Sequence, residues 1–170
     1  MNSNQGNYGR SKKLGYKNDL RIKAIENGTV IDHIKPGQAL NVLHILGVDD
    51  DFKNTVSIVM NTDGERGGKD VIKIEGRELT EKEVETIALL SPKATVNIIR
   101  DYEVVSKRKI GTPESICGIV KCVNPNCITN SHEPVETQFI VTENEKTKTL
   151  ALRCVFCESV MTTELFNYII

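Results

Sequence analysis

Two pairs of cysteines constrain this chain more than any other feature of its sequence. Four residues separate Cys122 from Cys127, two separate Cys154 from Cys157, and 26 residues lie between the pairs. Each pair is spaced to wrap one ion from a tight turn, and four thiolates match the tetrahedral, soft-donor preference of zinc. Such a ligand set leaves no position open for a substrate water. The sequence therefore predicts one structural Zn²⁺ ion per chain.

The other interpretations of these cysteines are two disulfides, four unrelated buried thiols and an iron–sulfur cluster. The first residues contain no apolar region typical of a signal peptide, and no window approaches the roughly 18 apolar residues of a membrane span. We therefore expect a cytoplasmic protein, where thiols stay reduced and paired cysteines favour a metal. His132 is an alternative ligand, and Cys117, outside both pairs, is expected to be a small core residue.

Length and composition are typical of a globular protein with two compact units. The chain has 170 residues, a hydrophobic fraction of 39% and only five prolines, too few for a linker-rich or disordered chain. Its formal net charge is −1, so no overall field attracts nucleic acid or a membrane. We expect neither as a partner.

Strand and helix patterns alternate from residue 20 to residue 107. A capping box at Thr80 and Glu83 predicts the start of a helix that ends at Ser91. An earlier helix is expected to have Pro36 in its first turn and to end at Gly47. The expected extended segments are residues 20–25, 29–34, 55–61, 70–76, 94–99 and 102–107.

This order is close to the split β-α-β arrangement of a ferredoxin-like domain. We expect an α+β protein, in which the first unit is a ferredoxin-like sheet with two helices on one face. The second unit is expected to be a small all-β, zinc-ribbon-like domain that needs its metal to fold, because it has few apolar residues. The predicted boundaries are a flexible basic arm over 1–19, a ligand-binding domain over 20–110 and a zinc domain over 114–170.

Three polar residues of the first unit suggest a ligand site. Asp32 and His33 end an apolar strand, and Lys73 interrupts an apolar run. Facing positions on a sheet could bring this carboxylate, imidazole and ammonium together, a combination that suits a polyphosphate and a sugar hydroxyl. The simpler alternative is that Lys73 is an ordinary lysine on a solvated face of the sheet. The sequence contains no P-loop, no G-x-G-x-x-G, no nucleophile elbow and no open metal site. We therefore expect a binding protein and no enzyme, and assign no catalytic residue.

Five motifs in order carry a resemblance to a known family. They are GTVIDHI, GGKDVIKIEG, PKATVNIIRDYEVVSK, CVNPNC and RCVFCE. From about Leu20 to its C-terminus the chain resembles the regulatory chain of aspartate carbamoyltransferase. The resemblance implies a non-catalytic subunit of pyrimidine biosynthesis, with an allosteric nucleotide domain and a zinc domain that docks on the catalytic chain. It also implies a regulatory-chain homodimer within a larger hetero-oligomer.

In that family CTP inhibits and ATP activates by competing for one site, with UTP as a further candidate effector. The resemblance assigns phosphates to His33 and Lys107, ribose and base edge to Asp32 and Lys73, and the base pocket to Tyr102 and Ile25. The full set that it implies for nucleotide binding is Ala24, Ile25, Asp32, His33, Lys69, Lys73, Asn97, Ile99, Tyr102, Val104 and Lys107.

Lys69 matches a position that, in bacterial relatives, helps to hold a second nucleotide through Mg²⁺. Lys23 stands where the family can carry an acid, which leaves the preference for purine or pyrimidine open. The resemblance places Asn124, Asn126 and Glu158 against the catalytic chain.

The competing hypothesis is a zinc ribbon that binds nucleic acid, since paired cysteines on tight turns also build such modules. The lysines of this region form no stripe, and the region is rich in acids, namely Glu133, Glu136, Glu143, Glu145, Glu158 and Glu164.

Overall fold

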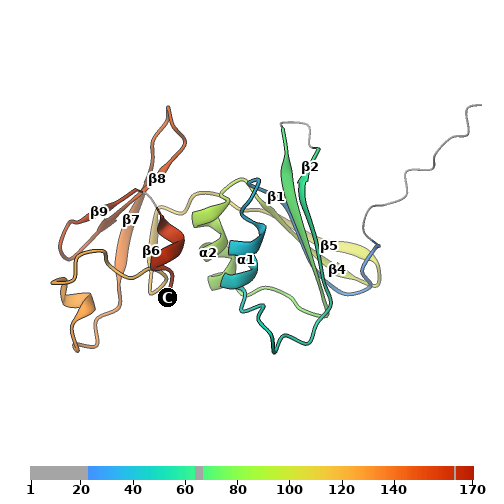
Figure 1. Ribbon diagram of the computed structural model, residues 1–170, viewed down its shortest axis with the longest axis horizontal. Helices are drawn as coiled ribbons and strands as arrows, with labels where there is room; N and C mark the ends of the chain where they lie inside the picture. Colours follow the sequence, from blue (N-terminus) through green and yellow to red (C-terminus); the bar gives the residue numbers. More distant parts are fainter. Residues whose placement is uncertain (1–22, 64–66, 163) are drawn as a thin grey trace, which may run out of the picture.

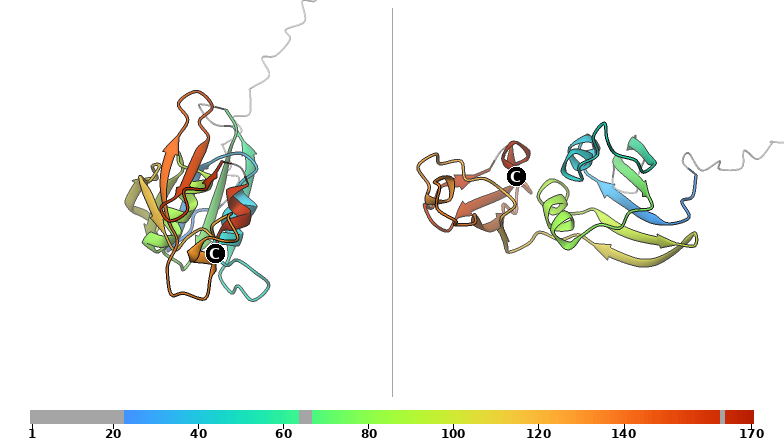
Figure 2. Two further views of the ribbon diagram at one scale, coloured as in Figure 1. Left: turned by 90° about the vertical axis from the view of Figure 1, so that its left-hand side faces the viewer. Right: turned by 90° about the horizontal axis from the view of Figure 1, so that it is seen from below.

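The computed structural model describes residues 23–63, 67–162 and 164–170. Two sheets, one in each half of the chain, are separated by two helices (Figures 1 and 2). The predicted arm over residues 1–19 lies outside the described residues. Among those described, no helix is long and apolar enough to cross a membrane.

The first unit contains a five-stranded antiparallel sheet in the order β2-β3-β1-β4-β5. The chain order β1-α1-β2-β3-α2-β4, with β1 between β3 and β4, is ferredoxin-like, and β5 adds a hairpin strand at one edge. The α+β prediction is confirmed. The elements are β1 (Gly28–Ile34), α1 (Ala39–Ile45), β2 (Val56–Thr62), β3 (Lys69–Glu75), α2 (Glu81–Leu90), β4 (Thr95–Arg100) and β5 (Glu103–Lys109).

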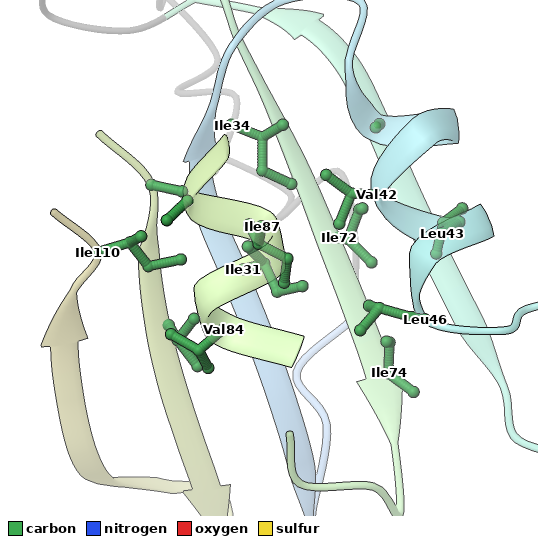
Figure 3. Packing of buried hydrophobic residues seen from close by; sticks show 14 residues of the cluster. Ile31, Ile34, Val42, Leu43, Leu46, Ile72, Ile74, Val84, Ile87 and Ile110 are labelled. Atoms are coloured by element: carbon green, nitrogen blue, oxygen red, sulfur yellow. The ribbon is translucent and has the colours of Figure 1, made fainter. Parts of the chain in front are cut away.

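The core of the first unit lies between the sheet and the two helices (Figure 3). Ile31 on β1 and Ile72 on β3 are fully buried, as are Val42 on α1 and Ile87 on α2. Alternate residues of each strand point away from this core, which is the period-two pattern of a sheet covered on one face. No helix among the described residues covers the opposite face of the sheet.

The predicted capping box of α2 is confirmed. The Thr80 side chain accepts a hydrogen bond from the Glu83 N–H, and the Glu83 carboxylate accepts one from the Thr80 N–H. The prediction for α1 was wrong by about one turn, because this helix begins at Ala39 and leaves Pro36 in the preceding turn. The buried carboxylate of Asp70 accepts from the N–H of Ala39, and so supplies a remote cap that local sequence patterns do not reveal.

The predicted strand over residues 20–25 is also wrong in its described part. Residues 23–25 lie outside every sheet, and the Lys23 carbonyl instead accepts a hydrogen bond from the Lys73 Nζ at 2.9 Å. Ile25 is buried, so burial accounts for this apolar residue without strand pairing. β1 begins at Gly28, whose φ is +140° and where a Cβ atom would lie 2.1 Å from the Ile74 carbonyl oxygen. Only glycine fits this close approach.

The second unit is a four-stranded antiparallel sheet in the order β6-β7-β8-β9. Phe139 and Leu152 are fully buried at its centre. Cys117 is exposed, which corrects the expectation that it is a core residue; at the end of β6 its side chain points away from the core toward Glu136. The elements are β6 (Ser115–Cys117), η1 (Ile128–Asn130), β7 (Gln138–Glu143), β8 (Leu150–Cys154), β9 (Val160–Met161) and η2 (Leu165–Tyr168).

The helices of the first unit contact the second unit directly. Leu89, in the last turn of α2, is buried in the hydrophobic cluster of the second unit. His44 of α1 meets the ring of Phe166 edge-on, with ring centroids 5.4 Å apart. A cleft of about 350 Å³ lies beside this contact. α1 and α2 therefore connect the open sheet to the cysteine-bearing unit.

Candidate functional site

The four paired cysteines meet at one point in the second unit. Cys122 and Cys127 lie on the loop between β6 and β7, Cys154 ends β8, and Cys157 lies in the turn before β9. Their sulfur atoms all lie within 4.8 Å of one another. His132 is exposed and outside this group, so the alternative of a histidine ligand is not supported.

The sulfur separations fit one tetrahedral ion. The Sγ atoms of Cys122 and Cys157 are 3.5 Å apart, and those of Cys127 and Cys154 are 3.8 Å apart. A disulfide needs about 2.05 Å. Zn–S bonds of about 2.3 Å in a tetrahedron place neighbouring sulfurs about 3.8 Å apart. A multinuclear iron–sulfur cluster is disfavoured, because its thiolates bind different iron atoms and must stand further apart.

Neighbouring side chains fix both cysteine turns. Thr129 Oγ1 donates to the Cys127 sulfur at 3.2 Å. The Asn130 amide donates to the carbonyls of Cys122 at 2.9 Å and Asn124 at 2.7 Å. The Asn124 side chain accepts from the Asn126 N–H at 3.0 Å. Such outer contacts orient metal ligands, so Asn124 and Asn126 also have a structural role in the first cysteine turn.

The thiols differ in how readily they ionise. Burial raises the pKa of Cys122 to about 12 and also raises the pKa of Cys154. Hydrogen bonding to Ser159 is the main cause that lowers the pKa of Cys157 to about 6. At neutral pH Cys122 and Cys154 hold their protons unless a cation replaces them. The donor set therefore suits a dication that keeps all four sulfurs ionised.

The cysteine turns form an exposed surface. Asn126 and Glu158 are exposed and Asn124 is half-buried. Val123 and Phe156, next to ligands on the two turns, are 40% and 45% exposed. Adjacent apolar and polar groups on a rigid surface are typical of a protein interface. The family resemblance pointed to the polar residues, whereas the apolar part of this surface was not predicted.

The open face of the first sheet carries a row of polar side chains. Val30 on β1 lies opposite Lys73 on β3 and Asn97 on β4, and Asn97 lies opposite Lys107 on β5. Cross-strand neighbours share a face. This face is the one away from the helices, because the next residue on β1, Ile31, is buried beneath them. The Asn97 amide donates to the Val30 carbonyl at 3.3 Å.

A second polar group lies at the end of β1. Lys69 Nζ is 2.7 Å from Asp32 Oδ1, and His33 Nδ1 is 3.4 Å from Asp32 Oδ2. The register of β1 against β3 shifts between Ile31 and Ile34, and His33 takes a φ of +58° at this irregularity. A β-bulge commonly re-aims a side chain in this way. The bulge exposes His33 beside Asp32.

The other residues assigned to the nucleotide lie toward the opposite end of the same sheet. Tyr102 occupies the β4–β5 turn with a φ of +65°, and its N–H donates to the Glu26 carbonyl at 2.9 Å. Ile99 lies opposite Val104. Ala24 is exposed beside buried Ile25. The hydrogen bond to Glu26 thereby holds the β4–β5 turn against the segment that carries Ala24 and Ile25.

One cation near the row was missed in the sequence. Lys109 lies opposite Thr95, which in turn lies opposite Asp32. Its alternation with Lys107 along β5 is the signal that could have identified it.

Both units match models of one protein family. Residues 20–111 match the model "Aspartate carbamoyltransferase regulatory chain, allosteric domain", and residues 114–167 match the model of the metal binding domain of the same chain. The chain is 55% identical over 149 residues to the aspartate carbamoyltransferase regulatory chain of Methanosarcina barkeri, covering 88% of this chain and 95% of the relative. It is 47% identical over 152 residues to that of Haloarcula marismortui, covering 89% and 94%.

Proposed function

The chain belongs to the family of aspartate carbamoyltransferase regulatory chains, and on this basis we propose that its first unit binds CTP and ATP while its second unit docks on the catalytic chain. It is a non-catalytic chain that acts in the allosteric regulation of pyrimidine biosynthesis. The proposed units span residues 20–110 and 114–170. The match of both units to the regulatory family disfavours the nucleic-acid-binding alternative.

One observation carries the nucleotide proposal, namely the row of Lys73, Asn97 and Lys107 on the open face of the sheet, beside Asp32 and its partners. Lysines bind phosphates as point charges, and an aspartate accepts hydrogen bonds from ribose hydroxyls. Lys107 and His33 are proposed to contact the phosphates, and Asp32 and Lys73 the ribose and base edge.

The exposed ring of Tyr102 and the buried side chain of Ile25 are proposed to form the base pocket, with Ala24, Ile99 and Val104 around it. Lys69 is proposed to contact a second nucleotide through Mg²⁺. Because Lys69 now pairs with Asp32, a ligand that recruits this lysine would free the carboxylate for a ribose hydroxyl. UTP is a further candidate effector of this chain.

Replacing Lys107 by alanine tests the nucleotide site. A hydrogen bond to a charged group contributes about 1.5–3 kcal/mol, so the dissociation constant for CTP should rise by about 10- to 100-fold. Calorimetry on the purified chain measures it. Lys53→Ala removes an exposed lysine that has no ion pair in the part of the chain that the structure describes, and should leave CTP affinity unchanged. Equal CTP affinity in both variants would remove Lys107 from the site.

The metal is proposed to be one structural Zn²⁺ held by Cys122, Cys127, Cys154 and Cys157. A tetrahedral set of four sulfurs is typical of zinc, and reduced thiols fit a cytoplasmic location. Asn124, Asn126 and Glu158, with the apolar residues beside them, are proposed to contact the catalytic chain. Pairing of two regulatory chains within a larger hetero-oligomer completes the proposed assembly.

Regulation requires that nucleotides bind two states of the assembly with different affinities. The coupling free energy is about 1–3 kcal/mol in typical cases, and linkage makes it reciprocal. We expect the CTP dissociation constant of the full complex to change by about fivefold or more when the active sites are filled with a substrate analogue. Calorimetry with and without the analogue measures the change. Identical CTP affinity in the two states would contradict allosteric control by CTP.

A further inference from the structure

Much of the proposed nucleotide site lies on the β4–β5 hairpin, in which β4 is largely buried but β5 is not held in place by burial. β5 is an edge strand whose residues are all exposed, and among the described strands it pairs only with β4. Edge strands with few buried contacts are the parts of a sheet that move most easily. The β4–β5 hairpin carries Asn97, Ile99, Tyr102, Val104 and Lys107.

Two consecutive residues of β5 face opposite sides of the sheet. Lys107 lies opposite Asn97 on the open face. Arg108 lies opposite Val96, which is buried beneath the helices. The Arg108 guanidinium forms an ion pair with Glu81, the first residue of α2. A single strand thus contacts the proposed ligand on one face and a helix on the other.

A second arginine of the hairpin anchors the same end of α2. Arg100, at the end of β4, donates from Nε and Nη2 to the two carboxylate oxygens of Glu78, at 2.8 and 3.1 Å. Glu78 lies two residues before Thr80, the N-cap of α2. We call Arg100, Arg108 and their two glutamates the arginine clamp. It ties both strands of the hairpin to the start of one helix.

α2 reaches from this clamp to the second unit. Its ten residues span about 15 Å. Val84 and Ile87 pack in the core of the first unit, while Leu89 is buried in the core that also contains the Cys122 and Cys154 side chains. The hydrogen-bonded helix therefore joins the clamp to the cysteine-bearing core.

We propose that the arginine clamp makes α2 follow the β4–β5 hairpin when a nucleotide polyphosphate draws Lys107 toward it, so that Arg100 and Arg108 determine how strongly nucleotide occupancy reaches the second unit. This inference rests on the proposed nucleotide site. Both arginines act as positioning residues and do not touch the nucleotide.

The clamp predicts a distinctive experimental signature. All four side chains are largely exposed, and exposed ion pairs contribute little to stability and are screened by salt. Loss of the clamp should therefore weaken regulation while leaving folding and nucleotide affinity almost intact.

The experiment uses the complex with the catalytic chain, comparing the wild type with an Arg100→Gln, Arg108→Gln double variant. Calorimetry gives the CTP and ATP dissociation constants, and carbamoyltransferase activity gives the factor by which each saturating nucleotide changes the rate. We expect the dissociation constants to stay within about threefold and the factor to shrink about threefold or more. Raising salt from about 0.05 to 0.5 M should shrink the factor in the wild type much more than in the variant.

Two further variants separate charge from local damage. Lys93→Gln removes an exposed lysine just after α2 that has no ion pair among the described residues, and should behave as wild type. Arg108→Lys in the Arg100→Gln background should restore part of the factor, because Arg108 uses a single nitrogen for its contact. The variant with Arg100→Gln and Arg108→Lys, which loses only one positive charge, also supplies the test against Lys93→Gln if the double glutamine variant does not fold.

Three outcomes would overturn the proposal. An unchanged factor with intact nucleotide affinity rejects the clamp and leaves the nucleotide site standing. A fall in affinity that matches the fall in the factor places the arginines in the binding pocket instead. Failure of the wild-type complex to bind either nucleotide rejects the nucleotide site and the clamp together.

Discussion

Replacing Cys154 by serine, or stripping the metal with a chelator or mercurial, should unfold the second unit and release catalytic subunits that are active but unregulated. Binding of a structural zinc ion contributes on the order of 10 kcal/mol, which exceeds the usual stability of a small domain. Cys154 is 1% exposed and belongs to the same cluster as Phe139 and Leu152. Loss of the metal therefore removes the support of this core as well as that of the exposed cysteine turns.

Circular dichroism, size-exclusion chromatography of the complex and metal analysis measure this result. The same substitution at Cys117, which is exposed and outside the cysteine cluster, should leave folding, metal content and assembly unchanged. Metal analysis should give one zinc per chain, and iron in its place would contradict the zinc assignment. A complex that persists without metal would limit the ion to an internal structural role.

The fold of the first unit could be predicted from sequence because its signals are local. The capping box at Thr80 needs only residues three apart, and burial on one face of a sheet requires alternating apolar residues. The failures occurred where distant residues decide the local structure. Asp70 sets the start of α1 across the chain, and the Lys73 side chain occupies the Lys23 carbonyl that a strand would have used.

The two sites differ in how much their sequence reveals. Cysteine pairs encode a metal site directly, since each pair lies within one turn. The row of Lys73, Asn97 and Lys107 depends on three strand pairings, β1 with β3, β1 with β4 and β4 with β5, which no local pattern specifies. Lys73 was singled out from its apolar surroundings, but the family resemblance supplied Asn97 and Lys107. The partners of Arg100 and Arg108 depend in addition on where α2 begins relative to the sheet.

Replacing Asp70 by alanine should lower the free energy of unfolding by about 3 kcal/mol or more. Asp70 is fully buried on β3, and its carboxylate accepts from the N–H groups of Gly37, Ala39 and Asn61 at 2.8, 3.1 and 2.9 Å. Alanine leaves all of these donors without an acceptor. Urea unfolding followed by circular dichroism measures the loss.

Asp70→Asn gives a graded comparison. Oδ2 serves both Gly37 and Ala39, so an asparagine that keeps one oxygen there retains those contacts but turns its amide group toward the Asn61 N–H. Its stability should fall between wild type and alanine. Asp50→Ala removes an exposed carboxylate and should unfold as the wild type does. If Asp70→Ala unfolds at the same urea concentration as Asp50→Ala, the carboxylate does not hold these three segments together.

The same substitution should also weaken nucleotide binding without touching the nucleotide. Asp70 lies opposite Ile34 across the irregular end of β1 and directly follows Lys69 on β3. Loosening this junction releases the backbone that holds His33 in its left-handed conformation and Lys69 beside Asp32. We therefore expect a higher CTP dissociation constant for Asp70→Ala at temperatures where the chain is still folded. Unchanged CTP affinity there would show that the bulge keeps its shape without the buried carboxylate.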